Sequence, residues 1–296
     1  MVMSLRWTAL SASVQGASHE HRGQGNQDAV RLKNPSGADD VLLIAVADGH
    51  GSTRSFRSDL GSAMAAECAL RELSRLIRRL GPHAPLSRVR NQANTRWPAS
   101  LIAAWKSAVR ADLAIHPFSQ LDFAAFPEAP PVLQPGKDLP ISAYLAYGAT
   151  LVTVAITPRY ILYSQLGDGD ILTVQSDGVV SRPLPRLHEF MANQTMSLCS
   201  HHAEKKFQIQ VDPLRAGGPA LVMLSTDGYA NCFGHDDEFF KVGADFLSYL
   251  RTEGIEFVRE KLGAWLRQSS HDGSGDDITV GLATRDKALS SPTRTS

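Results

Sequence analysis

The sequence has few cysteines, no net charge and no long apolar run, and each of these features argues against a class of protein. Its three cysteines, Cys68, Cys199 and Cys232, are widely separated and form neither a CxxC pair nor a Cys/His ligand spacing. This argues against a disulfide framework and against a zinc motif. We expect free thiols in a reducing compartment.

Positive and negative side chains balance, with 30 Lys and Arg against 30 Asp and Glu. Such a balance gives no sign of a nucleic acid or an anionic membrane as the partner. No apolar run approaches the roughly 20 residues that span a bilayer, and residues 1–15 lack the features of a secretory signal. We therefore expect a cytoplasmic protein that binds neither nucleic acid nor membrane.

The chain has 296 residues, 43% of them hydrophobic, which suffices for a substantial core. The connections 157–159 and 167–169 are too short for a crossover helix, so the strands that they join should be antiparallel neighbours. The β-type apolar runs lie at 29–32, 41–47, 150–156, 160–166, 171–174, 207–211, 221–224 and 278–283.

Helical periodicity predicts one long amphipathic helix over 56–80 and a second helix after Pro98. Two more helices are expected at about 237–250 and 255–267. Strands and helices thus cluster in groups and do not alternate as βαβ units. This grouping predicts an α+β layered sandwich.

Two segments fall outside this pattern. A Pro-rich stretch over about 116–140 is interpreted as a surface insertion, with a partner-binding loop as the alternative. The polar residues 286–296 are expected to be a disordered tail. We therefore predict one domain over 1–285.

Acidic residues recur at the ends of the apolar runs. Two runs end abruptly in Asp-Gly, at Asp48 and Asp227, and Asp276 precedes the last run. A lone Asp-Gly pair is more often a hairpin turn, and Asp168-Gly169 is open to that interpretation. Carboxylates that converge without a basic partner suggest a site for hard cations.

Six short motifs, in this order along nearly the whole chain, resemble those of the metal-dependent serine/threonine protein phosphatases of the PPM class, also called type 2C. The opening of the chain is most similar to a divergent bacterial branch of that family. The motifs are GNQDA at 25–29, DGHGS at 48–52, GAT at 148–150, LGDGD at 166–170, LSTDG at 224–228 and GDDITV at 275–280.

The resemblance implies a central antiparallel β-sandwich flanked by helix pairs, in four α-β-β-α layers. It also implies two Mn²⁺ or Mg²⁺ ions. Asp48 would bridge both ions, the Gly49 carbonyl would bind one, and Asp227 and Asp276 would bind the other. A water between the ions would attack the phosphorus directly, without a covalent phosphoenzyme.

Further roles follow from the same resemblance. Asp28 would orient a metal-bound water from behind the ions. His50 matches the general acid that protonates the departing oxygen, the alternative being a turn-capping or water-binding histidine. Gln27 stands where many relatives carry a metal-ligating Glu, so one ion is expected to bind more weakly.

Two positions depart from the family pattern at its phosphate and metal sites. Gly23 occupies the usual place of a phosphate-binding Arg, and the adjacent Arg22 is either its replacement or a surface charge. His19 and His21 are weaker candidates. Ala146 stands where the pattern places an acid for a third ion, so no third site of that type is expected. The segment 177–219 takes the place of a mobile flap and, with 116–140, should determine substrate choice.

The leading hypothesis is a phosphatase that acts on phosphoserine and phosphothreonine in proteins, within a serine/threonine kinase pathway. The alternative is a phosphoprotein-binding or regulatory module of the same fold with a weakened site, as Gln27, Gly23 and Ala146 would allow. The intact Asp48 and His50 favour the enzyme. A third hypothesis, hydrolysis of a small phosphorylated molecule, would use the same metal chemistry.

Overall fold

The structure is a computed structural model, and it describes most of the chain. The strands form two five-stranded sheets, and every pair of neighbouring strands within them is antiparallel. The described residues are 6–36, 40–81, 84–119, 122, 139–186, 196–215 and 217–285.

The first sheet takes its strands from both ends of the chain. In spatial order it contains β1 (Trp7–Val14), β10 (Ile278–Arg285), β9 (Leu221–Ser225), β6 (Asp170–Val174) and β7 (Val180–Ser181). The second sheet contains β2 (Ala29–Lys33), β3 (Leu42–Ala47), β4 (Leu151–Ile156), β5 (Tyr160–Leu166) and β8 (Gln208–Pro213).

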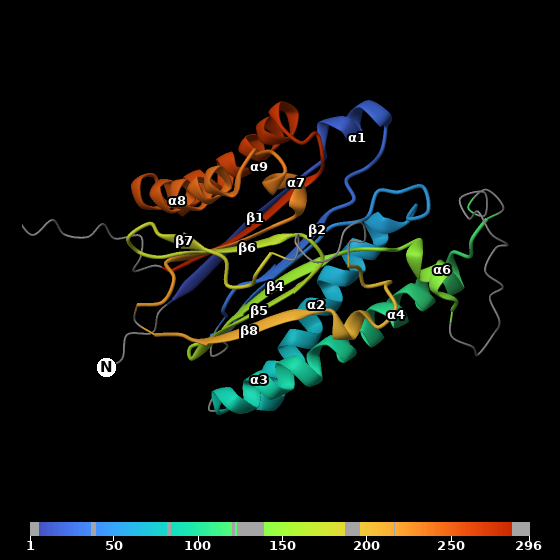
Figure 1. Ribbon diagram of the computed structural model, residues 1–296, viewed down its shortest axis with the longest axis horizontal. Helices are drawn as coiled ribbons and strands as arrows, with labels where there is room; N and C mark the ends of the chain where they lie inside the picture. Colours follow the sequence, from blue (N-terminus) through green and yellow to red (C-terminus); the bar gives the residue numbers. More distant parts are fainter. Residues whose placement is uncertain are drawn as a thin grey trace, which may run out of the picture.

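Helices cover the outer face of each sheet, so that the molecule has four layers (Figure 1). The second sheet carries α2 (Ser58–Leu80), α3 (Leu86–Thr95) and α4 (Trp97–Ile115), and the first carries α8 (Asp236–Thr252) and α9 (Ile255–Asp272). Shorter elements are α1 (Ala17–Arg22), α6 (Ile141–Leu145), α7 (Asp227–Ala230) and the 3₁₀ turn η2 (Ala203–Lys205). The predicted α+β sandwich is confirmed.

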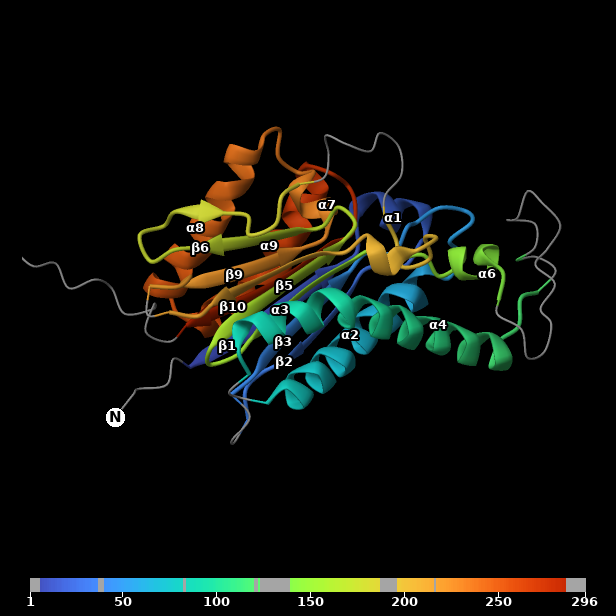
Figure 2. The same cartoon turned by 60° about the horizontal axis from the view of Figure 1, so that its bottom comes forward.

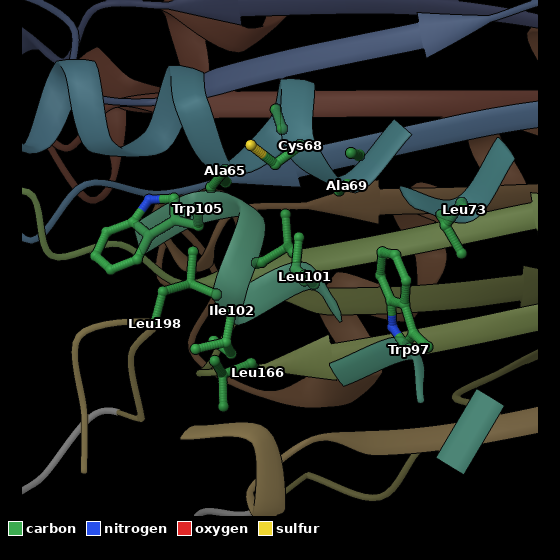
Figure 3. Close-up of a cluster of buried hydrophobic side chains, with 14 of the residues drawn as sticks. Ala65, Cys68, Ala69, Leu73, Trp97, Leu101, Ile102, Trp105, Leu166 and Leu198 are labelled. Atoms are coloured by element: carbon green, nitrogen blue, oxygen red, sulfur yellow. The ribbon is translucent and has the colours of Figure 1, made fainter. Parts of the chain in front are cut away.

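The alternation of side chains along β3 explains why the sheets lie in the middle. Leu43 and Ala45 pack toward the helices α2 and α4, whereas Ile44 and Val46 pack between the two sheets. Every residue of β3 is therefore buried, and the strand is an uninterrupted apolar run. On the helix side, Trp97 and other residues of α4 interleave with α2 and the sheet (Figure 3).

Besides the short elements α1, α6, α7, β7 and η2, two longer elements were not predicted, β1 and α3. The strand β1 carries small and polar side chains with little alternation, and its place is set by eight residues paired with β10. The helix α3 is polar and has no side-chain N-cap, and it follows α2 and continues directly into α4 (Figure 2). Both depend on tertiary neighbours more than on local sequence.

Some predictions fall partly or wholly outside the described residues. The tail 286–296 lies outside them, as do most of the Pro-rich stretch and the middle of the flap-like segment. The single domain over 1–285 thus stays a prediction. Among the described residues, every helix is too short or too polar to cross a membrane.

Gly61 in α2 has no room for a side chain. A Cβ added there would lie 1.9 Å from the Tyr147 carbonyl oxygen, and the Gly61 carbonyl accepts a hydrogen bond from Trp105 Nε1 at 3.0 Å. We expect Gly61→Ala to lower the free energy of unfolding by about 1–3 kcal/mol, because the clash outweighs the gain in helix propensity.

Chemical denaturation measures this change, and Gly263→Ala in α9 is the matched control. Its nearest neighbour would be Arg267 Nη1 at 3.7 Å, so propensity alone should stabilise the protein by about 0.5–1 kcal/mol. Equal effects of the two substitutions would contradict the tight approach at Gly61.

Candidate metal centre

A polar cavity of about 400 Å³ lies where the ends of β3, β5 and β9 meet the start of β10. The short helices α1 and α7 lie at this end of the sandwich (Figure 1). The cavity is lined by Ser18, His19, Arg22, Gln27, Asp48, Gly49, His50, Gly51, Ser52, Thr150, Asp168, Asp227, Ser274, Gly275, Asp276 and Asp277.

Strand pairing brings the acids of this cavity together. Asp48 directly follows β3, and its carbonyl accepts a hydrogen bond from Thr150 N at 2.8 Å, which extends the pairing of β3 with β4. Asp168 follows β5 on the same sheet, while Asp227 follows β9 on the facing sheet. Residues far apart in the sequence thus share one sheet end.

Three carboxylates form the centre of the cavity. One oxygen from each of Asp48, Asp168 and Asp227 lies within 4.8 Å of the other two. Asp276 lines the same cavity beside Asp227-Gly228: a Cβ added at Gly228 would lie 3.2 Å from the Asp276 Cβ. The predicted acids therefore converge, and Asp168 joins them.

Sequence reasoning missed Asp168 as a candidate ligand. Its Asp-Gly pair was open to interpretation as a simple turn, although it follows a buried strand just as Asp48 does. That shared position was the available signal. Ala146, where the family pattern suggested a further acid, is fully buried in the core between helices and sheet.

The carboxylates destabilise one another's charged forms. The pKa of Asp48 lies well above its usual range because of burial first, and then because of the negative charges of Asp28 and Asp227. Burial also raises the pKa of Asp28 and of Asp276. Divalent cations would relieve this repulsion, and oxygen ligands of this kind suit Mg²⁺ and Mn²⁺.

Gln27 and Asp28 lie behind and beside the three carboxylates. Asp28 accepts a hydrogen bond from Thr226 Oγ1 at 2.8 Å, which fixes its carboxylate next to the Asp227 loop. Gln27 lines the cavity, and its Oε1 is buried without a hydrogen-bond partner among the described residues. An unsatisfied acceptor beside three carboxylates fits a hydrated cation.

Asp277 braces the loop that carries these two residues. Its carboxylate accepts hydrogen bonds from Gly16 N and Gln27 N, both at 2.6 Å, and lies 3.0 Å from His19 Nδ1. Sequence reasoning gave Asp277 no role. The brace joins the loop before β2 to the start of β10, so it fixes the position of Asp28 relative to Asp276.

His50 has a constrained ring in the cavity wall. Its backbone N–H donates to the Gly148 carbonyl at 3.2 Å, and a Cβ added at Gly148 would lie 2.5 Å from the His50 Cδ2. Burial lowers the pKa of His50, while the charge of Asp227 acts in the opposite direction. The glycine of the GAT motif thus makes room for the imidazole.

Arg22 lines the cavity from α1. Its Nε donates to the Ser18 carbonyl at 3.1 Å, which leaves its two terminal amino groups available to an anion. Gly23 ends α1 with a φ of 65°, in the left-handed region that favours glycine. The place of the usual Arg is therefore a helix C-cap.

The raised carboxylate pKa values predict how stability depends on pH in metal-free protein. Between the ordinary Asp value of 3.8 and the raised values of Asp28 and Asp48, the folded chain binds more protons than the unfolded chain. The contribution of these acids to the free energy of unfolding therefore falls as pH rises through this window.

Thermal unfolding in chelator at a series of pH values measures this effect. The lowered pKa of His50 makes the free energy of unfolding rise with pH near the usual His value of 6.5, which opposes the effect of the acids. Comparing wild type with Asp48→Asn isolates the effect of the acid, because both proteins contain His50. That variant should gain stability over wild type as pH rises, whereas Asp177→Asn, in an exposed turn, should not. Parallel pH curves for wild type and Asp48→Asn would contradict the repulsion.

Comparisons with known proteins identify the family of this chain. The sequence profile described as protein phosphatase 2C matches residues 15–267. No curated protein sequence gives a significant match. The matched range ends before Asp276, which the structure nevertheless places in the cavity.

Solved structures share the fold. The catalytic domain of the serine/threonine phosphatase PstP in complex with two manganese ions has 16% sequence identity and a TM-score of 0.55, with 95% of this chain and 99% of that chain covered. Stp1 from Staphylococcus aureus has 15% identity and a TM-score of 0.54, with 96% and 98% covered.

The S. agalactiae serine/threonine phosphatase has 18% identity and a TM-score of 0.53, with 94% and 99% covered. Such low identities show a common fold, whereas the family profile covers most of this chain. The chain therefore belongs to the protein phosphatase 2C family, as its motifs predicted.

Proposed function

We propose that the protein hydrolyses phosphoserine and phosphothreonine in proteins, with two Mn²⁺ or Mg²⁺ ions in the cavity. One observation carries the proposal: Asp48, Asp168 and Asp227 place carboxylate oxygens within 4.8 Å of one another, beside an unsatisfied Gln27 oxygen. Family membership supports the same chemistry. Asp48, Gly49, Asp227 and Asp276 would hold the ions as the motifs suggest, and Asp168 adds a further oxygen ligand.

When bound, the ions would supply a nucleophile at neutral pH and neutralise charge on the phosphate oxygens. The chain's own residues do the rest. Asp28, fixed by Thr226, would orient a water from behind the three carboxylates, and the unpaired Gln27 oxygen would accept a hydrogen bond from a water in the cavity. Arg22 binds the phosphate of the substrate through its terminal amino groups, and His50 protonates the departing oxygen.

The retained acids favour an enzyme over a phosphoprotein-binding module. A module that only binds phosphate would be expected to replace the carboxylates, because they repel anions in the absence of ions. We place the protein in the cytoplasm, where it would reverse phosphorylation by a serine/threonine kinase. A small phosphorylated molecule as substrate would require the same centre, so the assay compares substrates of both kinds.

Manganese-dependent release of phosphate from phosphopeptides tests the metal centre. We expect Asp48→Asn and Asp227→Asn each to lower kcat/KM at least about 100-fold, since each removes a direct ligand. Asp177→Asn, which alters an Asp-Gly pair in an exposed turn, is the matched control and should leave turnover unchanged. Activity that survives both ligand substitutions would show that these residues do not form the catalytic metal centre.

A comparison of leaving groups tests His50. We expect His50→Gln to lower kcat on a phosphoserine peptide about 100-fold or more, because a serine alkoxide must be protonated as it leaves. The same variant should retain most of its kcat on an aryl phosphate with an acidic phenol, which leaves without a proton. Equal losses of kcat on the two substrates would show that His50 positions the attacking water or supports the fold, and does not protonate the leaving group.

A further inference from the structure

A second cavity lies far from the metal centre, in the layer of helices on the second sheet. Its volume is about 130 Å³, and its lining residues come from the second half of α2, from α3 and from the start of α4. Figure 2 shows how these three helices are arranged. It is lined by Glu72, Arg75, Leu76, Arg79, Leu80, Arg88, Gln92, Arg96, Trp97 and Ser100. We call it the arginine groove.

The arginine groove carries an excess of positive charge in a chain whose net charge is zero. Glu72 is its single acid, and it pairs with Arg75 inside the groove and with Arg71 beside it. The guanidinium groups of Arg79, Arg88 and Arg96 form no hydrogen bond or ion pair with any residue that the structure describes. Three guanidinium groups therefore border a concave site without an acidic partner.

Rigid elements hold these arginines around the groove. Arg75 and Arg79 lie one turn apart on α2, as do Arg88 and Gln92 on α3. Arg96 follows Gln92 by four residues, at the junction of α3 and α4. The apolar floor is fixed by Trp97, whose indole Nε1 donates to Ser164 Oγ at 3.0 Å in the core. The donors thus converge from two helices onto one floor.

A phosphate group is the anion that best fits this arrangement. Guanidinium groups meet phosphate oxygens in pairs, and several arginines can share the charge of a dianion. Nucleic acid fits less well, because single strands need aromatic platforms for their bases and the one aromatic ring here, Trp97, is buried in the core. The chain as a whole also carries no net positive charge that would attract a nucleic acid.

The position of the groove limits which phosphate can reach it. The helix α2 begins at Ser58 beside Gly49 of the metal centre, and Arg79 lies near its other end, about 30 Å away at 1.5 Å per residue. An extended peptide needs about nine residues to span that distance. The groove therefore cannot hold the phosphate that is being hydrolysed.

We propose that the arginine groove binds a second phosphorylated residue of the protein substrate, about nine or more residues from the one that is hydrolysed. This rests on the proposed function for the identity of the partner. The occupied groove would anchor a multiply phosphorylated segment while the metal centre acts on another of its phosphates.

Peptide binding in chelator tests the groove apart from catalysis. We expect a labelled phosphoserine peptide to bind wild type at least tenfold more tightly than its unphosphorylated form, because the metal-free catalytic cavity is acidic and repels phosphate. The variant Arg79→Gln/Arg88→Gln/Arg96→Gln should lose this preference. The matched control Arg259→Gln/Lys261→Gln/Arg267→Gln removes the same charge from exposed positions on α9 and should keep it.

Kinetics with Mn²⁺ complete the test. A peptide with two phosphoserines about twelve residues apart should have a several-fold lower KM than its singly phosphorylated form. The groove variant should lose that difference in KM. Its turnover of an aryl phosphate should stay at the wild-type level. The proposal is overturned if the groove variant binds phosphopeptide like wild type, or if a single-stranded RNA of equal charge displaces the peptide more effectively. Absent turnover in wild type would contradict the proposed function but leave the binding result intact.

Discussion

Repulsion among buried carboxylates is the constraint on which the functional end of this molecule depends. Asp48, Asp168 and Asp227 share a small volume, and burial together with their neighbours raises the pKa of Asp48. Without the constraint of the fold, these carboxylates would move apart or become protonated. The two sheets, each packed between the other sheet and a layer of helices, hold the three carboxylates together. Divalent cations would relieve the repulsion, so the arrangement favours their binding.

Close backbone packing maintains this arrangement where side chains would interfere. A Cβ at Gly49 would lie 2.7 Å from the Gln27 carbonyl oxygen, and a Cβ at Gly228 would lie 2.1 Å from the Asp277 carbonyl oxygen. The glycines after Asp48 and Asp227 are therefore required by the approach of a neighbouring chain segment. Their place in an Asp-Gly pair does not reflect a hairpin turn, and this explains why the pairs at 48 and 227 differ from the exposed pair at 177.

The sequence predicted the layered α+β sandwich and the convergence of Asp48, Asp227 and Asp276, because apolar runs that end in acids are local patterns. It did not reveal Asp168 as a member of the centre, since a short turn between two strands has the same local pattern with or without a ligand. Asp277 also escaped notice, because its role consists of bonds to Gly16 and Gln27, more than 200 residues earlier in the chain. Long-range contacts of this kind, like the pairing that forms β1, produce no periodic pattern in the sequence.

One departure from the family pattern lies at this brace. Gln27 removes a negative charge from a position where many relatives carry Glu, and its backbone lies against the carboxylate of Asp277. The Gln27 N–H donates to the Asp277 carboxylate, which Gly16 N also stabilises and beside which His19 lies. The cavity thus keeps a buried carboxylate at Asp277, held by two backbone donors, next to the uncharged Gln27. Burial and then the charge of Asp277 raise the pKa of Asp28, while the two hydrogen bonds to Asp277 hold the loop that carries it. The loss of charge at Gln27 is thus accompanied by a fixed carboxylate next to the same loop.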